Sequence, residues 1–129
     1  MAEALLRREL RGQDGITVDS AGLGALVGHP ASEYSVELMA EIDEDITGHR
    51  AKQIHPDMVS DADLVLVMEG GHKRAIDDAD PTARGKVYRL GEWQDKDIKD
   101  PYRKPKEAYA DALVDIQAGV ASWVERIGA

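Results

Sequence analysis

Hydrophobic residues along this chain fall into short segments whose spacing alternates between the helical and the strand period. Apolar residues three or four positions apart predict helices over residues 1–11, 31–42, 72–79 and 105–127. Gly12 follows the first of these segments, as expected after a helix C-terminus, and Ser32 is a candidate N-cap of the second. Pro56 is placed to begin one further helical turn.

Three further segments predict β-strands, at residues 16–20, 63–68 and 86–90. The second is almost continuously apolar, which is typical of a parallel strand covered on both faces. Helices and strands that alternate along one chain predict a single α/β domain over residues 1–129, built on a parallel sheet. Such sheets bind ligands beyond the carboxyl ends of their strands, which here are the loops 20–30, 68–72 and 91–103.

The composition excludes several classes of protein. A net charge of −9 argues against non-specific binding to nucleic acid, because there is no excess of Lys or Arg to displace counterions. No apolar run reaches the roughly 18 residues that span a bilayer, and the first residues are too charged for a signal peptide, so we expect a cytoplasmic protein without membrane insertion. The chain has no cysteine and its four histidines are scattered, so we predict no disulfide, no metal site and no cofactor.

Three features of the predicted loops are candidates for chemistry. Asp100 precedes Pro101, and the proline stiffens the loop. Asp100 would therefore be presented as a general acid, with Tyr102 excluding water from its carboxyl group. An ordinary Asp-Pro turn is the alternative. Ser20 lies at the end of a predicted strand, where its hydroxyl would support a bound anion. An ordinary exit from the strand into the loop is the alternative. Trp93 and Tyr102 share one long loop, where aromatic side chains either bind flat groups or cover the core.

Taken in order, these segments resemble the low-molecular-weight protein-tyrosine phosphatases. The resemblance covers residues 1–6, 18–28, 48–54 and 63–68, followed by the diagnostic Asp100-Pro101-Tyr102. Residues 20–28, together with Trp93 and with Arg103 after Tyr102, look most like the bacterial subgroup that serves exopolysaccharide export. Enzymes of that subgroup dephosphorylate the tyrosine-rich tail of a membrane tyrosine kinase.

The resemblance implies a fold, a reaction and roles for individual residues. The fold would be a three-layer α/β arrangement, a parallel sheet flanked by helices. In the reaction a cysteine thiolate attacks phosphorus, a loop arginine clamps the phosphate, and an aspartic acid protonates the leaving phenolate and then activates water. By resemblance Asp100 is that acid and Ser20 orients the phosphate loop. The phenyl ring of a phosphotyrosine protein substrate would be flanked by Leu23, Trp93 and Tyr102.

The chain departs from the family pattern because the first strand, the cysteine and the loop arginine are absent. About fifteen residues of strand and loop would precede Met1, so we expect an N-terminally truncated domain whose central first strand is missing. This leaves three alternatives. The flanking strands close up, or another chain or a second copy of this one fills the gap, the second copy forming a homo-oligomer, or the domain is only marginally stable. Without a nucleophile we predict no phosphatase activity. The alternative is a catalytically dead binding module for a phosphotyrosine partner or an intact paralogue.

Overall fold

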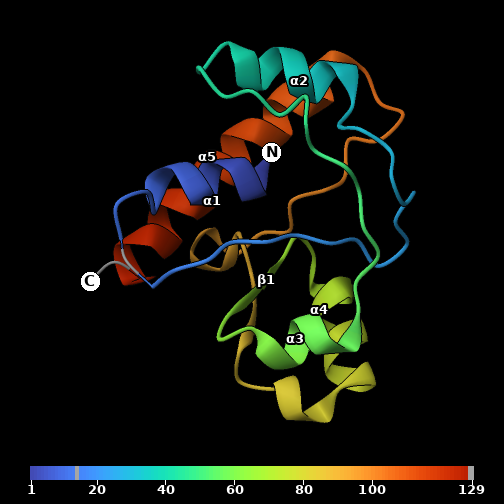
Figure 1. Ribbon diagram of the computed structural model, residues 1–129, viewed down its shortest axis with the longest axis vertical. Helices are drawn as coiled ribbons and strands as arrows, with labels where there is room; N and C mark the ends of the chain where they lie inside the picture. The colour runs from blue at the N-terminus through green and yellow to red at the C-terminus, as the bar shows by residue number, and fades with distance from the viewer. Residues whose placement is uncertain (14, 128–129) are drawn as a thin grey trace.

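The computed structural model describes residues 1–13 and 15–127, and Figure 1 shows how its elements are arranged. Its α-helices are α1 (Ala2–Glu9), α2 (Glu33–Ala40), α3 (Pro56–Asp61), α4 (Gly70–Ala79) and α5 (Lys106–Ile127). Its strands are β1 (Val65–Val67) and β2 (Val87–Arg89), and two short 3₁₀ helices are η1 (Pro81–Ala83) and η2 (Glu92–Gln94). The helices predicted from the hydrophobic pattern are confirmed. None of the helices in these described ranges is long and apolar enough to cross a membrane.

Local signals account for the start of α2 and of α3. The Ser32 hydroxyl accepts a hydrogen bond from the Ser35 backbone N–H at 3.2 Å, so Ser32 caps α2 as predicted. Pro56 occupies the first turn of α3, where a missing N–H is no loss. The His55 imidazole accepts the Asp57 N–H at 3.3 Å and so caps the same helix.

Helix α4 begins at Gly70 rather than at residue 72, where the sequence pattern placed its start. The Asp97 carboxylate accepts the Gly70 backbone N–H at 3.0 Å. A carboxylate at this point satisfies one of the unpaired donors of the first turn and interacts favourably with the helix dipole. Asp97, which is distant in sequence, therefore stabilises a helix that begins at Gly70 and includes Gly71.

The two strands form a parallel ladder. Val65 lies opposite Val87, and Val67 lies opposite Arg89. The ladder closes where the Leu90 N–H donates to the Val67 carbonyl at 2.7 Å. Helix α4 lies between the strands in the chain, as parallel neighbours require a crossover. The strands predicted at 63–68 and 86–90 are therefore confirmed, with shorter bounds.

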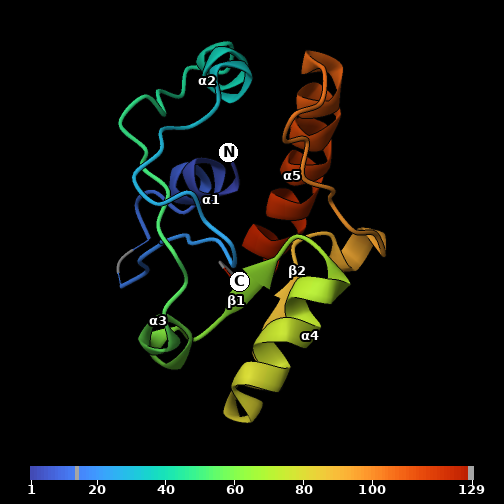
Figure 2. The same cartoon turned by 90° about the vertical axis from the view of Figure 1, so that its right-hand side faces the viewer.

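Successive residues of β1 face two different hydrophobic clusters. Val65 and Val67 pack with Val59 of α3 and Ile76 of α4. Leu66 packs against a larger cluster from α1, α2 and α5, which includes Leu5, Met39, Leu113 and Trp123. Figure 2 shows α3 and α4 on one side of the strands and α5 on the other. Helices on both faces of a parallel sheet make a three-layer α/β architecture, so the predicted fold class is confirmed.

The third predicted strand, at residues 16–20, is wrong. This segment joins no β-ladder within the described residues, and Figure 1 shows it running as coil between α1 and β1. Its nearest sheet-like contact is an isolated bridge between Gly22 and Gln53. The segment has the β-branched residues that favour a strand, but a strand also needs a neighbour to receive its hydrogen bonds. The sheet therefore has two strands in the described residues instead of three.

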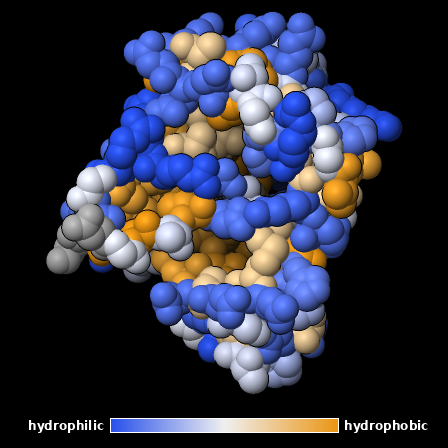
Figure 3. Space-filling view, viewed as in Figure 1, coloured by the Kyte–Doolittle hydropathy of each residue, from blue (hydrophilic) through white to orange (hydrophobic). Residues whose placement is uncertain are grey.

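The apolar surface between α1 and the sheet is incompletely covered. Figure 3 shows a hollow in the middle of this face, with hydrophobic residues on its floor and polar residues around it. Leu64, Leu66 and Met68 around β1, and Met1 and Leu6 around α1, are only half-buried against the larger cluster. Part of the larger hydrophobic cluster is therefore only half-covered around β1 and α1.

Candidate functional site

The candidate site surrounds the N-terminal end of α1. Figure 1 shows this end pointing toward the side of the molecule along which the 20–30 segment and the segment that leads into α5 run. The first turn of a helix presents backbone N–H groups without helical partners and the positive end of the helix dipole. Burial lowers the pKa of the Met1 amino group, and the nearby Glu3 carboxylate acts in the opposite direction. The helix dipole alone makes this end of α1 favourable for a negative charge, and Glu3 is the acidic residue of its first turn.

Ser20 is tied to this helix end by a short hydrogen bond. Its hydroxyl donates to Glu3 Oε1 at 2.6 Å, and the other Glu3 oxygen pairs with Arg7 Nη1 at 3.1 Å. Arg7 Nη2 also donates to the Val18 carbonyl at 2.6 Å. Side chains of α1 thus hold a segment that has no strand partner among the residues that the structure describes. The sequence pattern identified Ser20 but missed Glu3, although an acidic residue in the first turn of a helix was an available signal.

Asp100 lies in an anchored turn beyond the carboxyl end of β1. The Ile98 N–H donates to the Met68 carbonyl at 2.8 Å, which fixes the loop directly after the strand. One oxygen of the exposed Asp100 carboxylate accepts the Tyr102 N–H at 3.0 Å. The structure therefore has both the turn that is typical of an Asp-Pro pair and an Asp100 carboxylate whose position is fixed by a hydrogen bond. Such a carboxyl group is available for proton transfer at the end of the sheet where ligands bind.

Leu23 and Tyr102 present exposed side chains on two different loops. Leu23 is 41% exposed and Tyr102 is 52% exposed. The Gln53 side chain braces the first loop, because it donates to the Leu23 carbonyl at 2.6 Å and accepts the Ala25 N–H at 3.0 Å. No hydrogen bond between described residues joins Ser20 or Leu23 to the Asp100 turn. Each loop is therefore held by its own hydrogen bonds.

The structure separates Trp93 from Tyr102. The Trp93 ring meets Trp123 edge to face, with centroids 5.5 Å apart, and the Arg126 guanidinium lies 3.5 Å from its centroid. Both partners belong to the last turns of α5, whereas Tyr102 precedes Lys106, the first residue of that helix. A helix of 22 residues is about 33 Å long. This packing favours the second alternative for Trp93, a cover over the core.

An ion cluster that the sequence did not reveal fixes the loop after β2. Arg89 contacts Asp95 at 2.9 Å, and Glu92 and Asp97 at 3.3 Å each. Hydrogen bonds to these carboxylates, that to Asp95 foremost, raise the pKa of Arg89. The Gly70 N–H, with Arg89 second, holds the pKa of Asp97 below its ordinary value. The acidic residues were visible in the sequence, but nothing indicated that one strand residue binds all three.

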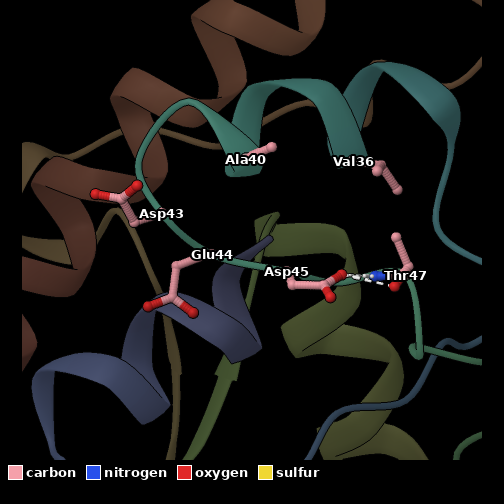
Figure 4. Close-up of a pocket in the computed structure, with 6 residues that line it drawn as sticks. All are labelled: Val36, Ala40, Asp43, Glu44, Asp45 and Thr47. Atoms are coloured by element: carbon pink, nitrogen blue, oxygen red, sulfur yellow. Dashed lines mark hydrogen bonds between the residues drawn. The ribbon is translucent and has the colours of Figure 1, made fainter.

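A separate hollow lies at the C-terminal end of α2, and Figure 4 shows its lining. Its volume is about 270 Å³, and it is lined by Val36, Ala40, Asp43, Glu44, Asp45 and Thr47. Glu44 already lies within 3.8 Å of both Arg8 and Arg11, and Asp45 accepts the Thr47 N–H and hydroxyl. None of the candidate site residues lines this hollow. In the part of the chain that the structure describes, no group of three or more His, Cys, Asp or Glu side chains is placed to hold a metal ion.

Comparisons with known sequences find related proteins. Residues 1–129 match the family described as low molecular weight phosphotyrosine protein phosphatase. The probable low molecular weight protein-tyrosine-phosphatase EpsP of Ralstonia solanacearum is 51% identical over 129 residues, which cover 100% of this chain and 87% of that protein. The low molecular weight protein-tyrosine-phosphatase Wzb of Escherichia coli K12 is 36% identical, over 99% of this chain and 86% of that protein.

Solved structures show the same fold. The Vibrio vulnificus Wzb structure in complex with benzylphosphonate matches with a TM-score of 0.89 and 37% identity, covering 97% of this chain and 87% of that one. A second structure, described as that of a protein tyrosine phosphatase, matches with a TM-score of 0.91 and 36% identity, over 99% of this chain and 86% of that one. In sequence and in fold, this chain belongs to the low-molecular-weight phosphotyrosine protein phosphatase family.

Proposed function

We propose that this chain carries the general acid and the substrate-facing loops of a protein-tyrosine phosphatase, with Asp100 as the acid. The Asp100 turn carries the proposal, because it lies directly beyond β1 and holds one carboxylate oxygen on the Tyr102 N–H while the side chain stays exposed. Membership of the phosphatase family, and the phosphatase names of EpsP and Wzb, support the same chemistry.

In this proposal Asp100 acts on the oxygen that leaves. As the cysteine sulfur of the family's phosphate loop bonds to phosphorus, the bond from phosphorus to the phenol oxygen breaks and the Asp100 carboxyl gives that oxygen its proton. The resulting carboxylate takes a proton from the water that hydrolyses the phosphocysteine. Leu23 and Tyr102 flank the phenyl ring, and Ser20, held by Glu3, orients the phosphate loop.

The proposed partner is a phosphotyrosine protein, and specifically the tyrosine-rich tail of a bacterial tyrosine kinase in exopolysaccharide export. Similarity to proteins named EpsP and Wzb supports this partner. Trp93 receives no substrate contact in this proposal, because it packs against Trp123. A cytoplasmic location, an N-terminally truncated domain and an oligomer that completes the sheet stay predictions.

The 129 residues contain no cysteine, so we propose that by themselves they do not form the covalent intermediate. The same fact favours a second candidate function, a binding module for a phosphotyrosine partner or for an intact paralogue. In that role the exposed Leu23 and Tyr102 side chains contact the partner, and Asp100 has no chemical step to perform.

Rates of phosphotyrosine hydrolysis test the proposal. The 129-residue chain is expected to give none, whereas a version extended by a cysteine-containing phosphate loop of the family is expected to hydrolyse it. In the extended version Asp100→Asn lowers kcat/KM by about 10²–10⁴. Asp78→Asn, which changes an exposed carboxyl of α4, is the matched control and leaves the rate unchanged. A full rate with Asp100→Asn contradicts the role of Asp100, and binding without hydrolysis by the extended version favours the second candidate.

A further inference from the structure

The segment that carries the proposed general acid is basic in an otherwise acidic protein. Residues 99–106 hold one acidic residue, Asp100, among Lys99, Arg103, Lys104 and Lys106, whereas the whole chain has a net charge of −9. We propose that Lys99, Arg103 and Lys104, termed the basic turn, form a docking surface for acidic residues that flank the phosphotyrosine of a protein substrate. The inference rests on the proposed function, because it takes Asp100 as the point that the phenol oxygen approaches.

The three cations of the basic turn are available to a partner. Their side chains are exposed, and none of them forms an ion pair with another residue in the described ranges 1–13 and 15–127. The neighbouring Lys106 differs, since its ammonium group lies 2.8 Å from the Glu37 carboxylate. Exposed charges without an internal partner steer an oppositely charged ligand and align it on the surface.

Backbone geometry holds Arg103 and Lys104 in the same turn as Asp100, and Lys99 precedes Asp100 directly in the chain. Two hydrogen bonds close the turn. The Lys104 N–H donates to the Pro101 carbonyl at 2.9 Å, and the Tyr102 N–H donates to the Asp100 carboxylate. Arg103 has a φ of +63°, and its guanidinium carbon lies 5.3 Å from the centroid of the Tyr102 ring. Because Tyr102 is the proposed wall of the phenyl site, this cation faces the residues next to the phosphotyrosine.

Charge complementarity selects an acidic peptide segment as the partner. A nucleic acid or an anionic membrane presents a far more extended negative charge, which the remainder of this acidic molecule repels. A peptide is smaller, and an extended chain advances about 3.3 Å per residue. Carboxylates two or three positions from the phosphotyrosine therefore reach the basic turn while the phenol oxygen stays near Asp100.

Peptide titrations of the ¹⁵N-labelled 129-residue chain, followed by NMR, test the inference at low ionic strength. The probes are a phosphotyrosine peptide flanked by two glutamates on each side, the same peptide with glutamines, and the glutamate peptide with unphosphorylated tyrosine. We expect the first to bind about three- to tenfold more tightly than the second, as a few exposed charge pairs contribute. The perturbed amides should include residues 99–104.

Two variants separate charge from shape. Lys99→Gln with Arg103→Asn and Lys104→Gln removes the charges, and asparagine suits the left-handed backbone at position 103. Lys99→Arg with Arg103→Lys and Lys104→Arg keeps them and is the matched control. The preference for glutamate flanks should disappear in the first variant and persist in the second, and the amide spectrum of each reports whether it is folded.

The outcomes distinguish this inference from the proposed function. Equal binding of the glutamate and glutamine peptides, a preference that survives loss of the charges, or no binding of any peptide overturns the inference. Binding to phosphatidylserine vesicles through the same three residues, in place of the peptide, also overturns it. A glutamate preference that depends on the charges but not on phosphorylation supports the docking surface, whereas the hydrolysis rates of the extended version test the phosphatase role of Asp100 separately.

Discussion

The Ser20 hydroxyl donates a 2.6 Å hydrogen bond to the Glu3 carboxylate, which joins the first turn of α1 to a segment that has no strand partner in the described residues. Arg7 extends this contact, since it pairs with Glu3 and donates to the Val18 carbonyl. Two hydrogen bonds from one helix, braced by the Glu3–Arg7 pair within it, therefore position the segment that leads to the candidate site. Their loss should affect both stability and the site.

Ser20→Ala removes the hydroxyl and leaves the Glu3 carboxylate without one of its donors. A hydrogen bond to a charged acceptor contributes about 1.5–3 kcal/mol, and we expect a loss near the lower end in urea unfolding, because Glu3 keeps its pairing with Arg7. Ser60→Ala, at an exposed position of α3, is the control and should change stability by less than about 0.5 kcal/mol. Equal effects of the two changes contradict this role of Ser20.

Gly119→Ala should destabilise the domain because α5 packs closely on the end of β2. A Cβ at this position would lie 2.7 Å from the Leu90 carbonyl oxygen and 2.9 Å from Leu90 Cγ. Overpacking of this kind costs about 1–3 kcal/mol, more than the ~1 kcal/mol that alanine gains over glycine in a helix.

Gly71→Ala is the matched control for that change. The nearest atom to its new Cβ would be Arg74 Nη2 at 3.8 Å, an ordinary contact. We expect a gain of up to about 1 kcal/mol in thermal unfolding of this variant. A Gly119→Ala protein as stable as the Gly71→Ala protein contradicts the close approach of α5 to Leu90.

The acid stability of the domain should depend on Asp97. Its pKa is lowered in the folded state, first by the Gly70 N–H and then by Arg89. A carboxylate with a lowered folded pKa stabilises the fold above its unfolded pKa of roughly 3.9, and this contribution is lost as the pH falls through the folded value. Asp97→Asn should therefore lower the Tm at neutral pH and flatten its fall between about pH 5 and pH 2. Asp61→Asn, an exposed carboxyl of α3, should leave the slope unchanged, and equal slopes in all three proteins argue against the Asp97 interaction.

Gln53 should control the order of the loop that carries Leu23. Its side chain makes two hydrogen bonds to that loop, at the Leu23 carbonyl and the Ala25 N–H. Gln53→Leu keeps the approximate volume and removes both, so hydrogen exchange at the Ala25 amide should rise roughly fivefold to tenfold, as the loss of about one hydrogen bond implies. The Ala51 amide, bonded to the His29 carbonyl at 2.8 Å, serves as an internal reference. Unchanged exchange at Ala25 would show that Gln53 does not brace the loop.

Helices and strands with local signals were predictable from the sequence. The Ser32 cap, Pro56 in a first turn and the apolar run at 63–68 each depend on neighbouring residues alone, and each is present in the structure. The failure at residues 16–20 has a physical reason. β-branched residues favour an extended backbone, but a β-ladder forms only where a neighbouring strand accepts and donates the hydrogen bonds.

Contacts between distant segments were not predictable in the same way. The Glu3–Ser20 pair spans 17 positions, and Arg89 gathers three carboxylates only because the loop after β2 folds back on it. The grouping of Trp93 with Tyr102 in one site had the opposite weakness. Their closeness in sequence suggested one site, whereas Trp93 packs on the last turns of the long α5 helix and Tyr102 precedes its start.

The dependence of kcat/KM on the leaving group tests the role of Asp100 most directly. In the chain extended by the cysteine-containing loop, a general acid makes aryl phosphates with poor leaving groups react nearly as fast as those with good ones. Asp100→Asn should make kcat/KM fall steeply as the pKa of the phenol rises, with a loss of about 10²–10⁴ for phosphotyrosine and a far smaller loss for p-nitrophenyl phosphate. An equally shallow dependence in both proteins would contradict the assignment of Asp100 as the general acid.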